Sequence, residues 1–274
     1  MTNPSNYILV TPGLDGVFDK VSCVPGLAGG DVQIFTGPVS YDNHGGSGPF
    51  VATLQLNGGT ALPNGRYRLF ICGSTSIVDL AGNALNNGSD EAVTFTVLAT
   101  GKPIPQTGFA PGLVTALPEQ PADKAYTDLG DLWIEIPRLN LKTSITGVPL
   151  KADGWNVTWL HRRVGWLEGT AYPTWAGNTV LTAHGYTADG EAGPFAFIKD
   201  LSYGDTIIIH LGGMKYIYAV RTNLLINPND THWLTQHEML DWVTLITCQQ
   251  YDEKTQSYRY RRVVRAVLIR VEQE

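Results

Sequence analysis

The sequence has no run of apolar residues long enough to cross a bilayer, a task that takes about 18 consecutive apolar positions. Its first ten residues, MTNPSNYILV, also lack the basic region and apolar core of a secretory signal. Charged residues are scarce at 16%, and 19 basic against 25 acidic side chains give a net charge of −6. This balance argues against a nucleic-acid binder that neutralises phosphates. We therefore expect a soluble protein, attached to a membrane only through an anchor outside this sequence.

The chain also has little of the Ala, Glu, Lys and Leu enrichment typical of long helices and coiled coils. It carries 30 glycines and 16 prolines, and its hydrophobic content of 43% is enough for a sizeable core. Many short strands joined by tight turns fit this composition. The sequence therefore predicts an all-β protein, and at about 150 residues per domain its 274 residues favour two domains.

The composition changes near residue 100. All seven tryptophans, and all but three of the 19 basic residues, lie beyond that point. Residues 101–112 hold three prolines and three glycines, which favours an extended, surface-lying connection. We therefore predict a first domain at residues 1–99, a linker at 100–130 and a second domain at 131–274.

The first domain alternates short apolar segments with Gly, Asn, Asp and Pro, a pattern typical of a β-sandwich. The predicted strands are residues 7–10, 31–35, 50–56, 67–72 and 92–98. Two further stretches, 62–69 and 77–85, resemble the closing strands of bacterial immunoglobulin-like surface domains. This resemblance implies a spacer or binding module without chemistry of its own.

The second domain has more strands, interrupted by two stretches that could be helical. The predicted strands are residues 132–136, 144–148, 178–184, 206–210, 215–222, 243–248 and 262–271, and the predicted short helices are 195–201 and 232–240. A closed or nearly closed barrel fits that many strands.

Three cysteines leave one thiol over after any pairing. Cys23 and Cys72 fall in the same small domain, where a disulfide can join two sheets in an oxidising extracytoplasmic compartment. The alternative is two buried free thiols that pack as small hydrophobes. No histidine and carboxylate set has convincing metal-ligand spacing, so we predict no metal and no other cofactor.

Cys248 closes an apolar, β-branched predicted strand, which is a rigid place for a nucleophile, although a lone cysteine after such a run is usually a core residue. A reactive thiol needs a partner that exchanges protons near neutral pH, as histidine does. His184 closes a similar strand and is followed by Gly185, a context that favours it over the other histidines. Those competing candidates are His161, His210, His232 and His237.

Acyl transfer also needs positive charge or oriented donors where an oxyanion develops. Arg261 lies thirteen residues after Cys248, at the start of the last predicted strand. Its planar charged fork suits a carbonyl oxygen, and Arg262 is the second candidate. The alternative is that these arginines and Arg265 are surface charges on an edge strand.

Three features of the sequence resemble those of the sortases, which are cysteine transpeptidases of bacterial surfaces. They are the Thr-Leu-Ile-Thr-Cys sequence at 244–248, the spacing from this cysteine to Arg261, and the Thr-Ala-His-Gly sequence at 182–185. An Ile-Glu-Ile-Pro-Arg-Leu segment at 134–139 is also similar to the opening strand of the family. The resemblance covers residues 130–271. Papain-like and L,D-transpeptidase patterns fit less well, because they differ in the order or spacing of cysteine and histidine.

The resemblance implies a sortase-type eight-stranded β-barrel with short helices. It makes Cys248 the nucleophile, His184 the proton donor and acceptor, and Arg261 the ligand of substrate and oxyanion. Ala183 and Thr247, beside the histidine and the cysteine, become substrate-binding positions. No cofactor is implied.

The implied reaction cleaves a Leu-Pro-x-Thr-Gly sorting signal between Thr and Gly through a thioester and passes the acyl group to an amine. The partners would be surface proteins that bear the signal and an acceptor such as a peptidoglycan precursor or a pilin lysine, at the bacterial cell envelope. The apolar part of the signal is expected to contact Ile226, Pro228 and Trp233. A non-catalytic adhesion or structural module is the alternative.

The predicted linker itself contains a sequence that resembles this signal, namely Ile104, Pro105, Gln106, Thr107 and Gly108. A genuine sorting signal is followed by an apolar span and a basic tail, which do not follow here. One interpretation is a chance match in a Pro/Gly-rich tether. The other is a tethered pseudosubstrate that lies near the active cleft and slows the enzyme.

Overall fold

The structure is a computed structural model in which the chain forms two compact units, Met1–Ala99 and Thr100–Glu274. The described residues are 2–12, 17–24, 26–27, 29–46, 50–79, 81–97, 104–151, 153–236 and 238–274. The segment predicted as a linker is part of the second unit, and its described residues 104–130 lie against the barrel. The reason is that its backbone forms hydrogen bonds with strands and loops of the barrel, for example from Thr127 to Gly147 and from Phe109 to Tyr186.

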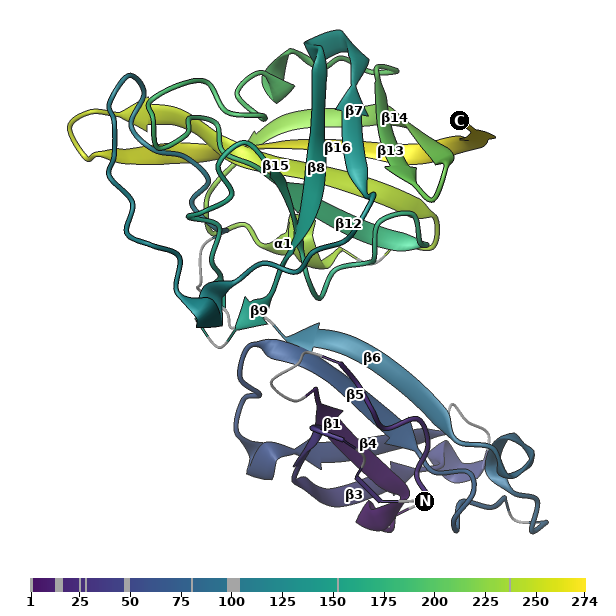
Figure 1. Cartoon of the computed structure of the whole chain (residues 1–274). Helices are drawn as coiled ribbons and strands as arrows, with labels where there is room; N and C mark the ends of the chain where they lie inside the picture. Colours follow the sequence, from purple (N-terminus) through teal and green to yellow (C-terminus); the bar gives the residue numbers. More distant parts are fainter. Residues whose placement is uncertain are drawn as a thin grey trace. The chain divides into compact units, whose positions relative to one another are not determined.

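The first unit contains two antiparallel sheets, one of four strands in the order β2-β1-β5-β6 and one formed by β3 and β4 (Figure 1). The strands are β1 (Tyr7–Thr11), β2 (Val32–Ile34), β3 (Thr36–Asp42), β4 (Val51–Leu56), β5 (Gly65–Ile71) and β6 (Glu91–Val97). The sequence did not predict β3, because Gly37 and Pro38 are residues typical of turns. The immunoglobulin-like character of these sheets stays a prediction.

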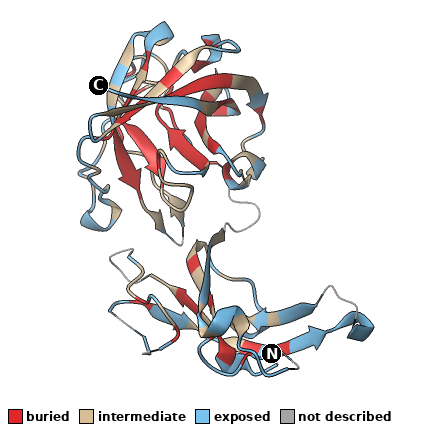
Figure 2. Cartoon of the chain, turned by 90° about the vertical axis from the view of Figure 1, so that its right-hand side faces the viewer, coloured by how far each residue is buried: buried red, intermediate tan, exposed pale blue. Residues whose placement is uncertain are grey.

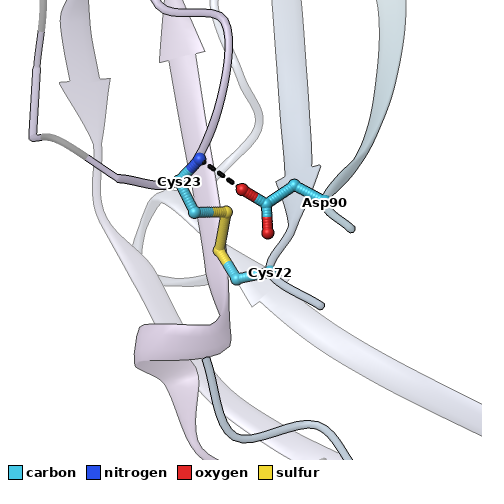
Figure 3. A group of neighbouring side chains, drawn as sticks. All are labelled: Cys23, Cys72 and Asp90. Atoms are coloured by element: carbon cyan, nitrogen blue, oxygen red, sulfur yellow. Dashed lines mark hydrogen bonds between the residues drawn. A yellow bond between two sulfur atoms is a disulfide. The ribbon is translucent and has the colours of Figure 1, made fainter. Parts of the chain in front are cut away.

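The first unit has a small core reinforced by a disulfide between Cys23 and Cys72, in which the sulfurs are 2.04 Å apart (Figure 3). Val10 and Phe70 pack around the disulfide. The carboxylate of Asp90 accepts the N–H of Cys23 at 2.7 Å and that of Ser74 at 3.0 Å. Since both sulfurs are bonded to each other, this cluster of two cysteines and an aspartate is a structural staple and has no thiolate to offer a metal.

The second unit is a closed eight-stranded barrel in the order β11-β12-β15-β16-β14-β13-β7-β8 (Figure 1). Its strands are β7 (Trp133–Ile136), β8 (Leu141–Val148), β11 (Val164–Leu167), β12 (Gly177–Thr182), β13 (Thr206–Leu211), β14 (Met214–Ile226), β15 (Asp241–Asp252) and β16 (Ser257–Gln273), with a small ribbon of β9 (Leu150–Lys151) and β10 (Gly154–Trp155). This mostly-β barrel confirms the predicted eight-stranded architecture. Its core is built mainly from strand residues, and Figure 2 shows buried positions in red along the strands.

Two parallel pairings distinguish this barrel from a simple up-and-down arrangement. β11 pairs in parallel with β8, and β12 pairs in parallel with β15, while the remaining neighbours are antiparallel. The sequence did not predict β11, which is only four residues long and contains Gly165. A side chain at Gly165 would collide with Val148 and Leu160, so glycine allows β8 and β11 to pack closely there.

The strand that bears Cys248 is longer than predicted. β15 continues to Asp252 and β16 begins at Ser257, so only residues 253–256 form the turn. The prediction that Cys248 closes its strand is therefore wrong. The reason is that polar and aromatic residues such as Tyr251 and Tyr258 pair across the hairpin.

The helices are short. The described helices are α1 (His232–Thr235) and the 3-10 turns Pro4–Asn6, His44–Gly46, Asn57–Gly59, Leu85–Gly88, Ala122–Lys124, Pro137–Leu139 and Ile198–Asp200. The two predicted helices, 195–201 and 232–240, are each reduced to about one turn, and Gln236 ends α1 with an extended ψ of 121°. Among the described residues, no helix is both long and apolar enough to pass through a membrane.

Candidate active site

The parallel pairing of β12 with β15 brings the histidine and cysteine segments together. Leu181 is paired with Leu245 and Thr182 with Ile246, which places the next residues, up to His184 and Cys248, at the same edge of the barrel. Thr247 Oγ1 donates a hydrogen bond to the Ala183 carbonyl at 2.8 Å. Ala183 and Thr247, predicted as substrate-binding residues, thus join the histidine segment to the cysteine segment.

Arg261 is the direct cross-strand partner of Cys248 in the hairpin of β15 and β16. Side chains of directly paired residues stand on the same face of a sheet, so the guanidinium and the thiol share one face. Both residues are buried, each with 4% of its surface exposed. Among the described residues no carboxylate pairs with Arg261, so its charge faces the site without a counter-ion.

Arg262 lies on the opposite face. It is paired with Thr247, and its guanidinium donates to the Asn223 side chain at 3.2 Å. Arg265 pairs with Glu238 and lies over the ring of Trp242. The three arginines that sequence could not separate therefore have different surroundings, and only Arg261 lies beside the thiol.

Burial dominates the protonation of the Cys248 thiol. It raises the thiol pKa above its ordinary value, while the positive charge of Arg261 and hydrogen bonds from Thr107 act in the opposite direction. The thiol is therefore neutral at physiological pH in this state. A neutral thiol is a weak nucleophile.

His184 is also buried and neutral. Burial lowers its pKa to about 4, and the backbone at Thr158 and Val157 only partly opposes this effect. Its ring lies 5.1 Å from the ring of Phe109, at an angle of 56°. Among the described residues, neither nitrogen of the His184 ring has a hydrogen-bond partner, and Cys248 does not provide one. The imidazole and the thiol are thus both neutral, and no hydrogen bond joins them.

Residues 104–108, which we call the strap, cross this site. The backbone N–H of Ile104 donates to the Pro228 carbonyl at 2.8 Å, and its carbonyl receives the Arg261 guanidinium at 3.5 Å. Ile104, Thr107 and Gly108 are buried, whereas Gln106 is exposed. The strap is therefore held at its first residue by the loop after β14 and by the arginine.

Thr107 of the strap lies directly against Cys248. Its N–H donates to Cys248 Sγ at 3.0 Å, and its hydroxyl lies 3.5 Å from the same sulfur and accepts the Cys248 N–H at 2.9 Å. Its carbonyl oxygen accepts the N–H of Gly185 at 2.9 Å. Every polar group of Thr107 is thus bonded to the residues that sequence selected as catalytic or to their neighbour.

The predicted pocket residues lie between the end of β14 and α1. Ile226 is the last residue of β14, Pro228 follows it in the connecting loop, and Trp233 lies in α1. Ile226 and Trp233 line an open pocket of about 370 Å³, together with Leu224, Leu225, Asn227, Asp230 and Tyr260. Pro228 is not part of that lining but contacts the strap through its carbonyl.

Two residues of the site were not singled out from sequence. The Gly185 amide bonds the Thr107 carbonyl, and the Tyr258 hydroxyl donates to the Phe109 carbonyl at 2.8 Å. The glycine after the histidine was visible in the sequence, but its role as a donor depends on the fold. Tyr258 lies in a Tyr-Arg-Tyr run that carries no signal of function. Of the competing histidines, His210 stacks on Trp133 away from Cys248, and His237 lies outside the described residues.

Comparison with known proteins finds similarity in the same part of the chain, the barrel unit. Residues 134–269, just under half of the sequence, match the family model described as Sortase domain. No curated protein matches the chain. Similar solved structures include sortase C-1 of Actinomyces oris (27% identity, covering 51% of this chain and 73% of that one, TM-score 0.42) and sortase A of Corynebacterium diphtheriae (26%, 52% and 61%, 0.41). Another is Clostridium perfringens sortase C with the C-terminal cell wall sorting motif (29%, 55% and 76%, 0.43).

The match includes His184, Cys248 and Arg261, and it ends within β16. Residues 134–269 of the barrel unit are therefore similar to the sortase domain.

Proposed function

We propose that the barrel unit is a cysteine transpeptidase that acts on a Leu-Pro-x-Thr-Gly-like sorting signal. The observation that carries this proposal is the strap, whose Ile-Pro-Gln-Thr-Gly sequence lies in the site with its threonine on Cys248. A peptide of the same kind from another protein can occupy the same contacts. Its threonine carbonyl would then lie where the Thr107 carbonyl lies, next to the Gly185 amide.

In the proposed first step, Cys248 Sγ forms a bond to the threonine carbonyl carbon and the bond from that carbon to the glycine nitrogen breaks. The thiol proton passes through His184 to the leaving amine. The Gly185 N–H and the Arg261 guanidinium stabilise the negative charge on the carbonyl oxygen. In the second step an amine nitrogen forms a bond to the thioester carbon and the bond from that carbon to Sγ breaks. The amine loses one proton, which His184 returns to the thiolate.

This reaction requires a change from the state described above. The strap holds the sulfur through Thr107, and His184 contacts Phe109 instead of the thiol. We propose that the strap is a tethered pseudosubstrate, which keeps the thiol neutral and must leave before another peptide binds. The imidazole can then approach the sulfur and accept its proton.

The proposed partners are surface proteins that carry the signal and an acceptor amine such as a peptidoglycan precursor or a pilin lysine. The proposed location is the bacterial cell envelope, outside the membrane. A disulfide in the first unit agrees with an oxidising compartment.

The test is an incubation of the whole chain with a Leu-Pro-x-Thr-Gly peptide and an amine, followed by mass spectrometry. We expect a ligated product and, without added amine, a thioester on Cys248. Cys248→Ala should abolish both, and His184→Ala and Arg261→Ala should lower the rate by at least about 100-fold. If the wild-type chain and a strap variant both fail to form any thioester, the barrel is a non-catalytic module.

A further inference from the structure

The strap contains one position at which no side chain fits. A Cβ atom built on Gly108 would lie 2.8 Å from Cε2, 3.0 Å from Cζ and 3.1 Å from the hydroxyl oxygen of Tyr258. Ordinary van der Waals contacts of a Cβ are about 3.4 to 4 Å. Gly108 is therefore packed directly against the outer part of the Tyr258 ring.

The Tyr258 ring is held in place from more than one side. It is buried, with 7% of its surface exposed, and its hydroxyl donates to the Phe109 carbonyl at 2.8 Å. Its cross-strand partner in the hairpin is Tyr251, whose ring packs edge-on at 5.1 Å. Because paired strands and a neighbouring aromatic ring fix its position, the ring cannot make room for an added methyl group without disturbing the hairpin.

Gly108 follows the threonine that lies on the nucleophile. In a peptide bound as the strap is bound, the residue at this place carries the nitrogen that leaves when the thioester forms. We infer that Tyr258 is a specificity-determining residue that admits glycine at the position after the scissile bond and excludes residues with a side chain. This inference rests on the proposed transpeptidase function.

The same ring also restricts the second substrate. The amine that resolves the thioester attacks the same carbonyl carbon from the side on which the first amine left. Its nitrogen must therefore be attached to a carbon that fits beside Tyr258. The acceptor class is a primary amine on an unbranched CH₂ carbon, such as an N-terminal glycine or a lysine side chain, and amines on branched carbons are excluded.

The experiment compares two donor peptides that differ only in glycine or alanine after the threonine, and two acceptors, glycinamide and alaninamide. For the wild-type chain we expect kcat/KM to favour glycine on the order of 10 to 100-fold in each comparison, the usual effect of one methyl group in a tight pocket. Tyr258→Leu removes the outer ring atoms but keeps apolar volume, and should bring both ratios to about threefold or less. Tyr258→Phe keeps the ring carbons and should retain most of the preference.

Tyr203→Ala is the matched control, because this tyrosine is 77% exposed and is not among the residues that contact the strap. It should give the wild-type ratios. Tyr258→Leu could also release the strap. That release would change the rates with both donor peptides equally, so it would cancel in the ratio of their kcat/KM values. Unchanged ratios in folded Tyr258→Leu would overturn the inference, whereas the absence of product from every peptide would overturn the proposed function itself.

Discussion

Arg261 and Arg262 are adjacent in sequence, but the alternation of side chains along β16 (Ser257–Gln273) gives them different roles. Arg261 is paired with Cys248 and reaches the strap carbonyl of Ile104, whereas Arg262 is paired with Thr247 and reaches Asn223. Only one of these guanidinium groups can therefore stabilise charge at the thiol.

We predict that Arg261→Lys lowers kcat/KM for the sorting-signal peptide by about 10 to 1,000-fold, because a lysine ammonium cannot reproduce the planar fork. Arg262→Lys should change it by less than about threefold. The measurement is steady-state ligation with a fixed amine. Equal losses in the two variants would show that the arginine acts on folding of the hairpin and has no specific part in the chemistry.

At the scale of elements, the strap controls how far the thiol is buried. Burial is the largest cause of the raised Cys248 pKa, and Thr107 contributes two of the contacts that cover the sulfur. Thr107→Ala keeps the N–H but removes the hydroxyl, which contacts the sulfur and accepts the Cys248 N–H, and this loss should loosen the strap and admit water to the site. The thiol pKa should then fall. Burial raises this pKa by more than the hydrogen bonds from Thr107 lower it, so exposure to water has the larger effect.

We predict that Thr107→Ala accelerates alkylation of Cys248 by iodoacetamide at pH 7 at least about fivefold and shifts its pH profile to lower pH. The same change should raise turnover of an added peptide. Gln106→Ala is the control, since this exposed side chain of the strap should leave both rates within about twofold. Thr107→Ala with wild-type alkylation and turnover would refute the pseudosubstrate. A cut after Thr107, seen as a loss of the intact mass of 29.8 kDa, would mean that the strap is cleaved as a substrate.

β15 carries a carboxylate at each end, and the two have opposite pKa shifts. Burial raises the pKa of Asp241 to about 6, although the Tyr218 hydroxyl donates to it at 2.8 Å. Asp252 is partly buried, and its hydrogen bonds and ion pair with Arg259 lower its pKa. Asp241 thus destabilises the fold when ionised, and Asp252 stabilises it.

We predict that Asp241→Asn raises the free energy of unfolding at pH 7.5 by roughly 1 to 3 kcal/mol, because a buried ionised group is removed. The sign follows from the raised pKa: stability is lost as pH rises from the ordinary carboxyl value, 3.8, through about 6. The gain should therefore disappear near pH 3, where the group is neutral in both states. Urea unfolding at the two pH values measures the difference, and Asp252→Asn should instead lower stability at pH 7.5. A gain for Asp241→Asn that is equal at both pH values would contradict this explanation.

At the scale of the whole molecule, the chain is built from two units with different means of stabilisation. The barrel has a large apolar cluster, whereas the first unit has small clusters around its disulfide. The disulfide closes a loop with a sequence separation of 49 residues, for which chain entropy predicts a stabilisation of about 4 kcal/mol.

We predict that calorimetry shows two melting transitions and that a reducing agent lowers only one of them, by roughly 15 °C or more. Peptide turnover by the barrel at 25 °C should not change, because Cys248 is already a free thiol. Cys23→Ser should reproduce the effect without reductant. A reductant-dependent shift of both transitions would show that the units do not unfold independently.

Much of the fold was predictable from sequence because the signals are local. Apolar segments of strand length, separated by turn residues, predicted most barrel strands. β11 (Val164–Leu167) was missed, because a segment of four residues that includes a glycine is too short to show the alternation typical of a strand. The end of the Cys248 strand was wrong, because pairing across the hairpin extends it through polar residues such as Gln249.

The sequence by itself determined which chemical groups are available: one unpaired thiol, a histidine before a glycine, arginines near the C-terminus and a signal-like segment ahead of the barrel. Only the tertiary structure decided that Arg261 is the arginine beside the thiol, that Thr107 lies on the sulfur and that Tyr258 lies against Gly108. The physical reason is that residue type and spacing are local properties of the chain. Contacts between residues as far apart as Thr107 and Cys248 depend instead on strand register and closure of the barrel.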